Sequence, residues 1–274
     1  MVGEMTFELS GAGALDYLNC GYGQKRLQFR GPEQKLDAPY AAFIGGTETY
    51  GKFVARPFPA LVEDMTGLAA VNLGVVNAGI ETFRSDLTVL NIARGAEFVV
   101  LQVMGPEYVS NRYFSVHPRR NDRFIRAAPQ LQQLYPRVDF TEIHFVGHLL
   151  HRLRRESVRN FRKVISECRL EWLISCVSLV RRIGRPTVLL WLSRKSGHAS
   201  GPDEFVTAQL LAPLEKRCLS VIQVLPDAHV LAEGTNGMVF GQMEAFAAMD
   251  LPNVAMHARV ATALYDGLRR VHLV

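Results

Sequence analysis

The sequence has few cysteines, and none stand in a spacing typical of a metal or redox site. No two of them form a Cys-x-x-Cys pair among the 274 residues. Cys168 and Cys176 fall in one predicted helix, where eight residues of rise hold them about 12 Å apart, too far for a disulfide. We therefore expect reduced thiols in a cytoplasmic protein without a bound metal. The cysteines are Cys20, Cys168, Cys176 and Cys218.

Long apolar segments are also lacking. The first eight residues include two acidic residues and no apolar run typical of a secretory signal. The longest apolar run near a helix, residues 172–180, is far shorter than the roughly 20 residues that a membrane span requires. No Gly-x-Gly-x-x-Gly or Walker sequence occurs, which argues against a nucleotide-binding protein. We expect no membrane insertion and no cofactor.

The charge balance gives little reason to expect a nucleic-acid partner. The chain has 31 basic and 26 acidic residues, for a net charge of +5. The basic run of residues 152–155 is typical of a solvated helix face, with anion or partner binding as the alternative. Hydrophobic residues make up 48% of the chain, which is ordinary for a globular protein with a sizeable core.

Short apolar runs that end in glycine or proline alternate with helical patterns. This alternation predicts a three-layer α/β/α fold with a mostly parallel central sheet, in which ligands bind at the carboxyl ends of the strands. We expect residues 1–39 to lead into a single domain, residues 40–274, with a helical insertion around 125–183. Predicted strands are 40–44, 69–73, 97–104, 187–192 and 219–225; predicted helices are 57–66, 78–94, 149–183 (as one helix or two) and 254–271.

Four segments, in order, resemble the sequence blocks of the SGNH/GDSL hydrolases. They are Phe43–Gly51, Asn72–Gly79, Val100–Gly105 and Pro252–Ala261. The stretch Ser110–Arg123 also looks like an uncharacterised bacterial subfamily of this fold. The resemblance implies a flavodoxin-like SGNH hydrolase fold and the hydrolysis or transfer of an ester. In that family a first-block serine attacks the ester, backbone amides and a third-block Asn stabilise the oxyanion, and a late Asp-x-x-His supplies the base.

The resemblance aligns Thr47 with the nucleophilic serine of the family. Here the sequence is Gly-Gly-Thr where the family has Gly-Asp-Ser. The Thr47 hydroxyl can attack an ester when a base activates it. The alternative is that Thr47 and Thr49 cap the helix that follows. The first and second blocks further imply Gly46, Gly74 and Asn77 as oxyanion or ligand-binding residues.

The third block departs from the family because Glu107 occupies the position of the Asn that stabilises the oxyanion. An ionised carboxylate repels a growing negative charge. Three alternatives remain open: Glu107 is protonated, Asn111 replaces it, or the step is not acyl transfer. Glu107 could instead be the general base toward Thr47 or a substrate hydroxyl, with a pKa raised by burial.

The catalytic histidine of the fifth block is replaced by Leu251, and His257 matches a family position that is usually structural. Asp227 and His229 directly follow the predicted strand 219–225, so they form a second candidate for orienter and base. The alternative for this pair is a surface turn after Pro226.

Basic residues follow the third predicted strand and would lie beside the cleft. Arginine suits carboxylate, phosphate or sulfate groups, whereas pairing with Asp122, Asp139 and Glu142 would merely fix the loop. His144, His148 and His151 share one helix face, but they lack the His-Glu-x-x-His pattern of zinc hydrolases, so we expect an exposed face. The basic set is Arg112, His117, Arg119, Arg120 and Arg123.

Together these observations predict an SGNH/GDSL-like hydrolase or acyltransferase that acts on an ester, such as a carbohydrate ester, with Thr47 as nucleophile. The alternative is a catalytically inactive protein of the same fold that binds an anionic or sugar ligand. In either case the partner is a small molecule or carbohydrate. The sequence leaves the oligomeric state open.

Overall fold

The structure, a computed structural model, describes residues 15–23, 27–193 and 205–274. Five parallel strands form its central sheet, in the order β2-β1-β3-β6-β7. Numbered within the sheet, this is the flavodoxin-like order 2-1-3-4-5. The predicted fold class is therefore confirmed, and each predicted strand is present. The strands are β1 (Tyr40–Gly45), β2 (Ala69–Gly74), β3 (Phe98–Gln102), β6 (Thr187–Leu192) and β7 (Ser220–Val224).

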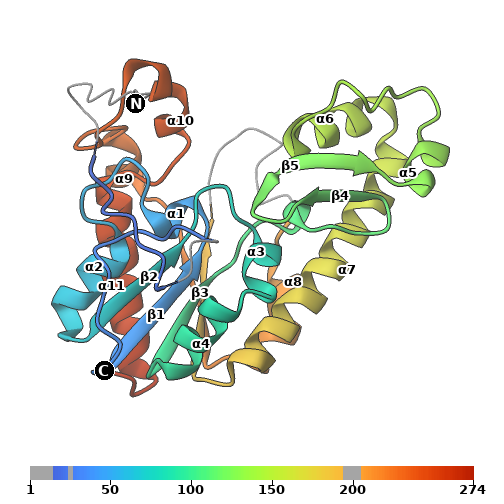
Figure 1. The fold of residues 1–274 in the computed structure, drawn as a ribbon. Coiled ribbons are helices and arrows are strands. Elements are labelled where there is room, and N and C mark those ends of the chain that lie inside the picture. The colour runs from blue at the N-terminus through green and yellow to red at the C-terminus, as the bar shows by residue number, and fades with distance from the viewer. Residues whose placement is uncertain (1–14, 24–26, 194–204) are drawn as a thin grey trace, which may run out of the picture.

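Helices cover both faces of the sheet (Figure 1). One face packs against α2 (Phe58–Thr66) and α11 (Val254–Arg270). The other packs against α3 (Ile80–Arg84), α4 (Leu87–Gly95), α7 (Val158–Ile183) and α8 (Ala208–Glu215). Buried apolar side chains fill both layers, so the strands have no polar face, as parallel strands covered on both sides require.

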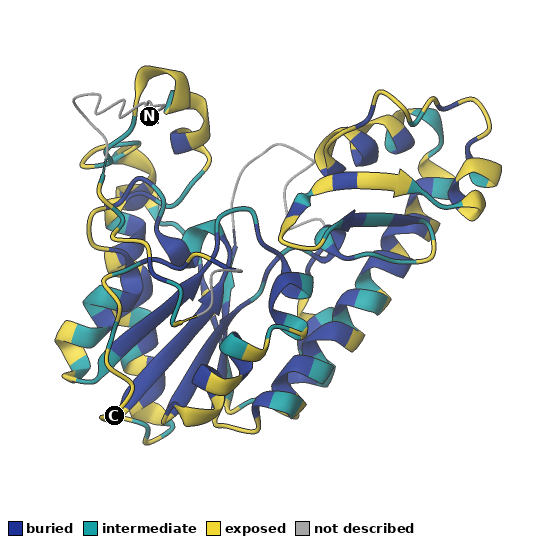
Figure 2. Ribbon diagram, in the orientation of Figure 1, coloured by how far each residue is buried: buried dark blue, intermediate teal, exposed yellow. Residues whose placement is uncertain are grey.

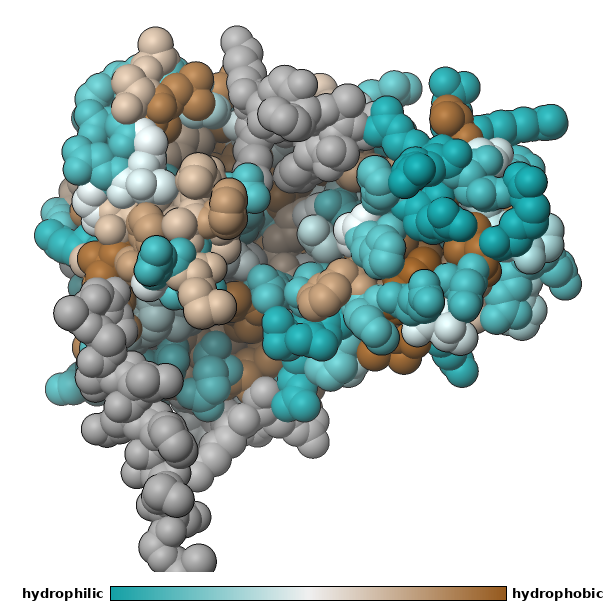
Figure 3. Space-filling view, turned by 90° about the horizontal axis from the view of Figure 1, so that it is seen from above, coloured by the Kyte–Doolittle hydropathy of each residue, from teal (hydrophilic) through white to brown (hydrophobic). Residues whose placement is uncertain are grey.

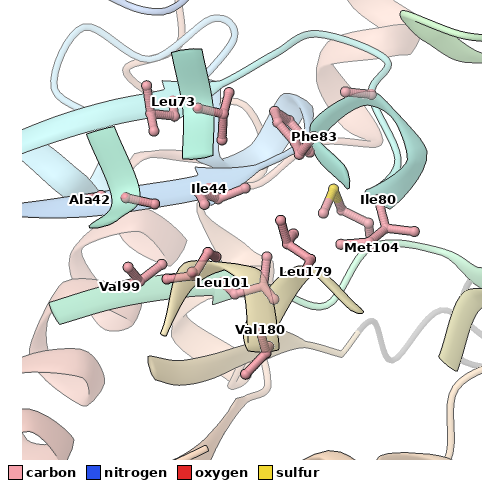
Figure 4. Close-up of a cluster of buried hydrophobic side chains, with 14 of the residues drawn as sticks. Ala42, Ile44, Leu73, Ile80, Phe83, Val99, Leu101, Met104, Leu179 and Val180 are labelled. Carbon is pink, nitrogen blue, oxygen red and sulfur yellow. The ribbon is translucent and has the colours of Figure 1, made fainter. Parts of the chain in front are cut away.

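The core between the sheet and α7 shows how the layers interlock (Figure 4). Ile44 of β1 and Leu101 of β3 lie beside Leu179 of α7, and all three are almost fully buried. Burying one such side chain stabilises a protein by about 2 kcal/mol. This packing fixes the strand ends at which the candidate site lies.

The predicted helix 78–94 is divided in two, and the segment expected as one helix or two, 149–183, forms two. The segment 78–94 forms α3 and α4 because the Asp86 carboxylate accepts the Val89 N–H at 3.0 Å and starts a new helix. The segment 149–183 forms α6 (Val146–Glu156) and α7, with Ser157 capping α7.

A second packing unit projects beyond the sheet, and we call residues 110–165 the arm. It contains the antiparallel hairpin of β4 (Phe114–His117) and β5 (Arg120–Ala127), α5 (Pro129–Leu134), α6 and the start of α7. The arm has its own buried cluster and an outer surface that is largely exposed (Figure 2). The long helix α7 belongs to both cores, because its first turns pack in the arm and its later turns on the sheet.

Short helices and turns cover the carboxyl ends of the strands. They are α1 (Thr47–Tyr50), η1 (Pro106–Tyr108), α9 (Ala228–Ala232), η3 (Gln242–Glu244) and α10 (Ala245–Met249). Among the described residues, no helix has the length and apolar character to span a membrane.

Candidate active site

A cavity of about 740 Å³ opens at the carboxyl ends of the strands. This is where ligands bind in open parallel sheets, because the loops that follow each strand meet there. One end of the cavity is polar, and the wall formed by α9, α10 and the start of α11 is mainly apolar. The polar lining includes Thr47, Glu48, Asn77, Gln102, Glu107, Asp122, Ser193 and Asp250; the apolar lining includes Met104, Leu192, Val230, Leu231, Met249, Leu251 and Met256.

Thr47 is the first residue of α1 and faces this cavity. Its hydroxyl oxygen accepts the backbone N–H of Asn77 at 2.9 Å. Asn77 has a left-handed backbone, with φ of 59°, which asparagine tolerates better than most residues. No side chain caps α1, so the alternative in which Thr47 and Thr49 cap this helix does not describe the structure.

Gln102, at the end of β3, holds the turn that carries Thr47. Its buried Oε1 accepts the Gly46 N–H at 3.0 Å, the Thr49 N–H at 3.3 Å and the Thr49 hydroxyl at 2.6 Å. Its Nε2 donates to Glu48 at 2.9 Å. A Cβ atom on Gly45 would lie 2.4 Å from Gln102 Oε1, so only glycine fits beneath the amide. The turn is therefore fixed by one side chain from the neighbouring strand.

Gly46 and Gly74 have structural roles in the same region. The Gly46 N–H is bonded to Gln102, and the Gly74 N–H donates to Asn72 Oδ1 at 2.8 Å. A Cβ atom on Gly74 would lie 2.2 Å from the Tyr50 backbone nitrogen, because α1 packs directly on the end of β2. Neither glycine is among the residues that line the cavity.

Arg30 supports the far end of α1. Its buried guanidinium donates to the carbonyl oxygens of Gly51 at 3.1 Å, Val54 at 3.1 Å and Ala55 at 2.8 Å, with a longer contact of 3.4 Å to Tyr50 O. The guanidinium also lies 4.9 Å from the ring centre of Tyr17. Burial lowers the pKa of Arg30 from its usual value, and the ring of carbonyl dipoles compensates for the lost water.

Glu107 lies in η1 and is the most perturbed acid of the cavity. Its side chain is buried, and its Oε2 has no hydrogen-bond partner. Burial raises the pKa of Glu107 to about 7, so the carboxyl changes its protonation state near neutral pH. Gly105 makes room for it, because a Cβ there would lie 2.6 Å from both carboxylate oxygens. This geometry suits an acid or base that exchanges protons with a ligand.

Asp122 provides a second acid from the arm, on β5. Its Oδ1 is buried without a hydrogen bond and lies 3.9 Å from Arg120 Nε. Burial raises the pKa of Asp122 above its ordinary value. The preceding residue, Asn121, fixes the hairpin to the sheet unit, because its Oδ1 accepts the Gly79 N–H at 2.7 Å and the Thr82 hydroxyl at 2.9 Å. Sequence reasoning treated Asp122 only as an ion-pair partner in a loop.

The structure does not bring Asp227 and His229 to Thr47. Asp227 caps α9 by accepting the Val230 N–H at 2.9 Å and also pairs with Arg259, and these contacts lower its pKa. The His229 side chain is 75% exposed and lies 3.9 Å from Glu233. Both residues lie outside the cavity lining, and within the described part of the chain that lining includes no histidine. The pair occupies the surface turn that sequence reasoning kept as its alternative.

The predicted ligand-binding residues after β3 fix their own loops. Asn111 Oδ1 accepts the backbone N–H groups of Tyr113 at 2.9 Å and Phe114 at 3.3 Å. Arg112 pairs with Glu167 of α7 rather than with Asp122, Asp139 or Glu142, whereas Arg120 lies 3.9 Å from Asp122, one of the expected partners of the basic set. None of the predicted set Asn111, Arg112, His117 and Arg119 lines the cavity.

His117 closes the hairpin turn, since its Nδ1 accepts the backbone N–H groups of Arg119 at 3.3 Å and Arg120 at 3.2 Å. His144, His148 and His151 are exposed on or beside α6. Among the described residues, no group of three or more His, Cys, Asp or Glu side chains could hold a metal ion. All four cysteines are free thiols.

His257 of α11 is buried on the face of the sheet that α2 and α11 cover. Its Nδ1 accepts the Phe58 N–H at 3.1 Å, and its ring stacks on that of Phe58 with centres 5.8 Å apart. Burial lowers the pKa of His257 to about 3. It is a neutral packing residue, as expected for its position.

Sequence reasoning missed Gln102, Ser193 and Asp250, which also line the cavity. Gln102 gave a usable signal, because it is the polar residue at the end of the apolar run Phe98–Gln102. Ser193 likewise follows the apolar strand β6. Asp250 gave none, because it lies in a connection without a clear pattern.

Two solved structures are similar to this chain at low sequence identity. No curated protein matches the chain. A salicylyl-acyltransferase, SsfX3, from a tetracycline biosynthetic pathway is similar, with a TM-score of 0.40 and 13% identity over 88% of this chain. This chain covers only 58% of that protein. A putative lipolytic protein of the G-D-S-L family from Desulfitobacterium hafniense DCB-2 has a TM-score of 0.41 and 15% identity, over 81% of this chain and 99% of that one.

A family model matches nearly the whole chain, from residue 5 to residue 272, and so includes both the sheet unit and the arm. The cavity, the turn that carries Thr47 and the buried Glu107 all fall within the matched region. The chain belongs to the family described as a domain of unknown function, DUF6473.

Proposed function

We propose that this protein is a hydrolase or acyltransferase acting on an ester, with Thr47 as nucleophile and Glu107 as general base. One observation carries the proposal: Thr47 and Glu107 line the same cavity, and the buried Oε2 of Glu107 has no hydrogen-bond partner. The oxygen of Thr47 already accepts one N–H, from Asn77, so its own proton is available to a base. The carboxyl of Glu107, with a pKa of about 7, is matched to that proton transfer near neutral pH.

The reaction would have two halves, acylation of Thr47 and then removal of the acyl group. Thr47 Oγ1 attacks the ester carbonyl carbon while its proton passes to the Glu107 carboxylate. The carbonyl oxygen gains negative charge, which the backbone N–H of Thr47 would stabilise. The Asn77 N–H, which donates to Thr47 Oγ1 in this structure, would join it only once that hydrogen bond is exchanged. The bond to the leaving alcohol then breaks, and Glu107 returns the proton to that alcohol. In the second half, water or the hydroxyl of an acceptor attacks the carbonyl carbon of the acyl-threonine and gives its proton to Glu107. The bond to Thr47 Oγ1 then breaks, and Glu107 returns the proton to Thr47.

The lining favours a neutral, hydroxyl-rich substrate such as a carbohydrate ester. Glu48, Asp122 and Asp250 supply carboxylate acceptors for sugar hydroxyls, whereas an anion in the same space would be repelled. The apolar wall that includes Met249 and Met256 suits an acyl group or the face of a sugar ring.

The test is hydrolysis of short-chain aryl esters and acetylated sugars by the wild type beside four variants. Thr47→Ala and Glu107→Gln should each lower kcat/KM by on the order of 100-fold or more, whereas Thr47→Ser should keep activity. His229→Ala is the matched control, because His229 lies outside the cavity. Equal rates in the wild type and Thr47→Ala would overturn the proposal.

A second candidate is a catalytically inactive protein that binds a sugar. It is favoured by the lack of histidine among the described lining residues and by the internal hydrogen bonds of the Gly46 and Gly74 amides. Sugar binding by calorimetry that persists unchanged in Thr47→Ala, together with no turnover of any ester, would favour this candidate over the enzyme.

A further inference from the structure

The positive charge of the chain is concentrated in the arm. Residues 110–165 contain twelve basic and four acidic residues, a net charge of +8, whereas the whole chain carries +5. The rest of the chain therefore carries a net charge of −3. Eleven of the twelve basic residues are arginine, whose planar group binds phosphate oxygens in pairs.

Much of this charge is exposed and unpaired. Arg152 and Arg155 lie on the outer face of α6, and Arg159 and Arg162 continue it on the first turns of α7. Within the described ranges of the chain, none of these four side chains forms an ion pair with an acidic residue. Holding like charges together in one surface is unfavourable without a partner of opposite charge.

Apolar side chains are exposed on the opposite side of the cavity. We call residues 228–249, which include α9, η3 and α10, the knob. Met243 is 99% exposed and Phe246 is 84% exposed, and Leu231 and Met249 are each more than half exposed. Single exposed apolar residues are common, but a cluster with two nearly bare large side chains marks an interaction surface.

The knob and the arm border the same opening. Leu231 and Met249 of the knob line the cavity, and so does Asp122 of the arm. In Figure 1 both units rise past the carboxyl ends of the strands, one on each side. Figure 3, which looks onto that end, shows hydrophobic side chains mixed with hydrophilic ones over the knob region and mostly hydrophilic side chains over the arm.

We infer that this face docks on the surface of an anionic lipid bilayer, with the exposed knob side chains in the interfacial region and the arm on the headgroups. Exposed Met and Phe side chains enter the interfacial region favourably, and arginines are attracted to anionic headgroups. Docked in this way, the cavity opens toward the bilayer. A nucleic acid would engage the arm but leave Met243 and Phe246 in water, so it accounts for only one of the two surfaces.

The test is co-sedimentation of the full chain with vesicles, which requires no enzymatic activity. Vesicles of phosphatidylcholine alone are compared with vesicles in which about one third of the lipid is phosphatidylglycerol. The knob variant is Met243→Ser with Phe246→Ser, and the arm variant is Arg152→Gln with Arg155→Gln. Controls are Leu170→Ser with Ile174→Ser, an exposed apolar pair of α7, and Arg269→Gln with Arg270→Gln, at the far end of α11. Circular dichroism checks that each variant is folded.

The wild type should bind the anionic vesicles at least about tenfold more tightly than the neutral ones, and less tightly as salt is raised. The knob and arm variants should each lose about tenfold in affinity, and both controls should bind like the wild type. Failure to bind anionic vesicles would overturn the inference, and so would equal losses in the control variants. Binding of duplex DNA that depends on the arm, without vesicle binding, would instead assign the arm to nucleic acid.

Discussion

The backbone N–H of Asn77 donates to the hydroxyl oxygen of Thr47 across 2.9 Å, which joins the turn after β2 to the start of α1. Because Asn77 has φ of 59°, the direction of this N–H depends on a left-handed backbone. The side chain of residue 77 is therefore less important to the turn than the conformation it permits.

Asn77→Gly should retain the hydrogen bond and most of the ester hydrolysis, because glycine adopts positive φ without strain. Asn77→Val should lower the free energy of unfolding by about 1–2 kcal/mol, since β-branched residues are strained there. Urea denaturation and kcat/KM measure the two effects. If Asn77→Gly were as inactive as Thr47→Ala, the side-chain amide itself would be required.

The pH dependence of kcat/KM should reveal Glu107. The rate should rise with pH and level off above a midpoint of about 7, because the base acts only when it is unprotonated and its pKa is raised to that value. Thr47→Ser should show the same midpoint. A profile that is flat between about pH 5 and pH 9 would exclude Glu107 as the base.

Glu107→Gln should stabilise the fold at alkaline pH while lowering activity. The folded-state pKa of about 7 lies above the ordinary value of 4.5, so the stability from the protonated acid is complete below 4.5 and is lost as the pH rises through 7. The variant should gain on the wild type by about 1 kcal/mol per pH unit across this window. Denaturant unfolding at several pH values measures the gain, with Glu142→Gln as an exposed control.

His257→Asn should remove a pH dependence of folding stability that is opposite in sign to that of Glu107. The folded-state pKa is lowered from 6.5 to about 3, so the folded protein favours the neutral ring and loses stability as the pH falls below 6.5. Asparagine can still accept the Phe58 N–H, but it does not bind a proton. Stability of this variant should therefore fall less steeply with acid than that of the wild type; identical slopes would mean that His257 titrates normally.

Arg30→Met should destabilise the protein by about 2–4 kcal/mol, because several buried carbonyl oxygens then lose their donor. Arg30→Lys should recover only part of the loss, since one ammonium group cannot span all of them. Urea denaturation measures both variants. An unchanged midpoint in Arg30→Met would show that water can replace the guanidinium.

The sheet could be predicted because each of its strands is an apolar run that ends at a turn residue. The hairpin β4–β5 could not, because half of β5 is charged and its core partners lie far away along the chain. Single-sequence patterns report which residues are apolar, but not which distant segments bury them.

Part of the lining of the candidate site could be predicted from the positions of the strand ends. Thr47, Asn77 and Glu107 all line the cavity, because each directly follows a strand whose end the sequence marks. Asp227 and His229 also follow a strand, yet capping and solvent exposure turn them away. Asp122 reaches the cavity only through the fold of the arm. The direction of a side chain after a strand end depends on contacts that the sequence pattern does not contain.

Helix α7 joins the arm to the sheet unit through a continuous helix rather than through a loop. One unbroken rod of 26 residues serves both cores, and it packs against η1, the turn that carries Glu107. Swivelling the arm would require bending this rod or shifting that turn. The positions of the arm arginines and of the cavity acid Glu107 are therefore set by contacts with the same helix.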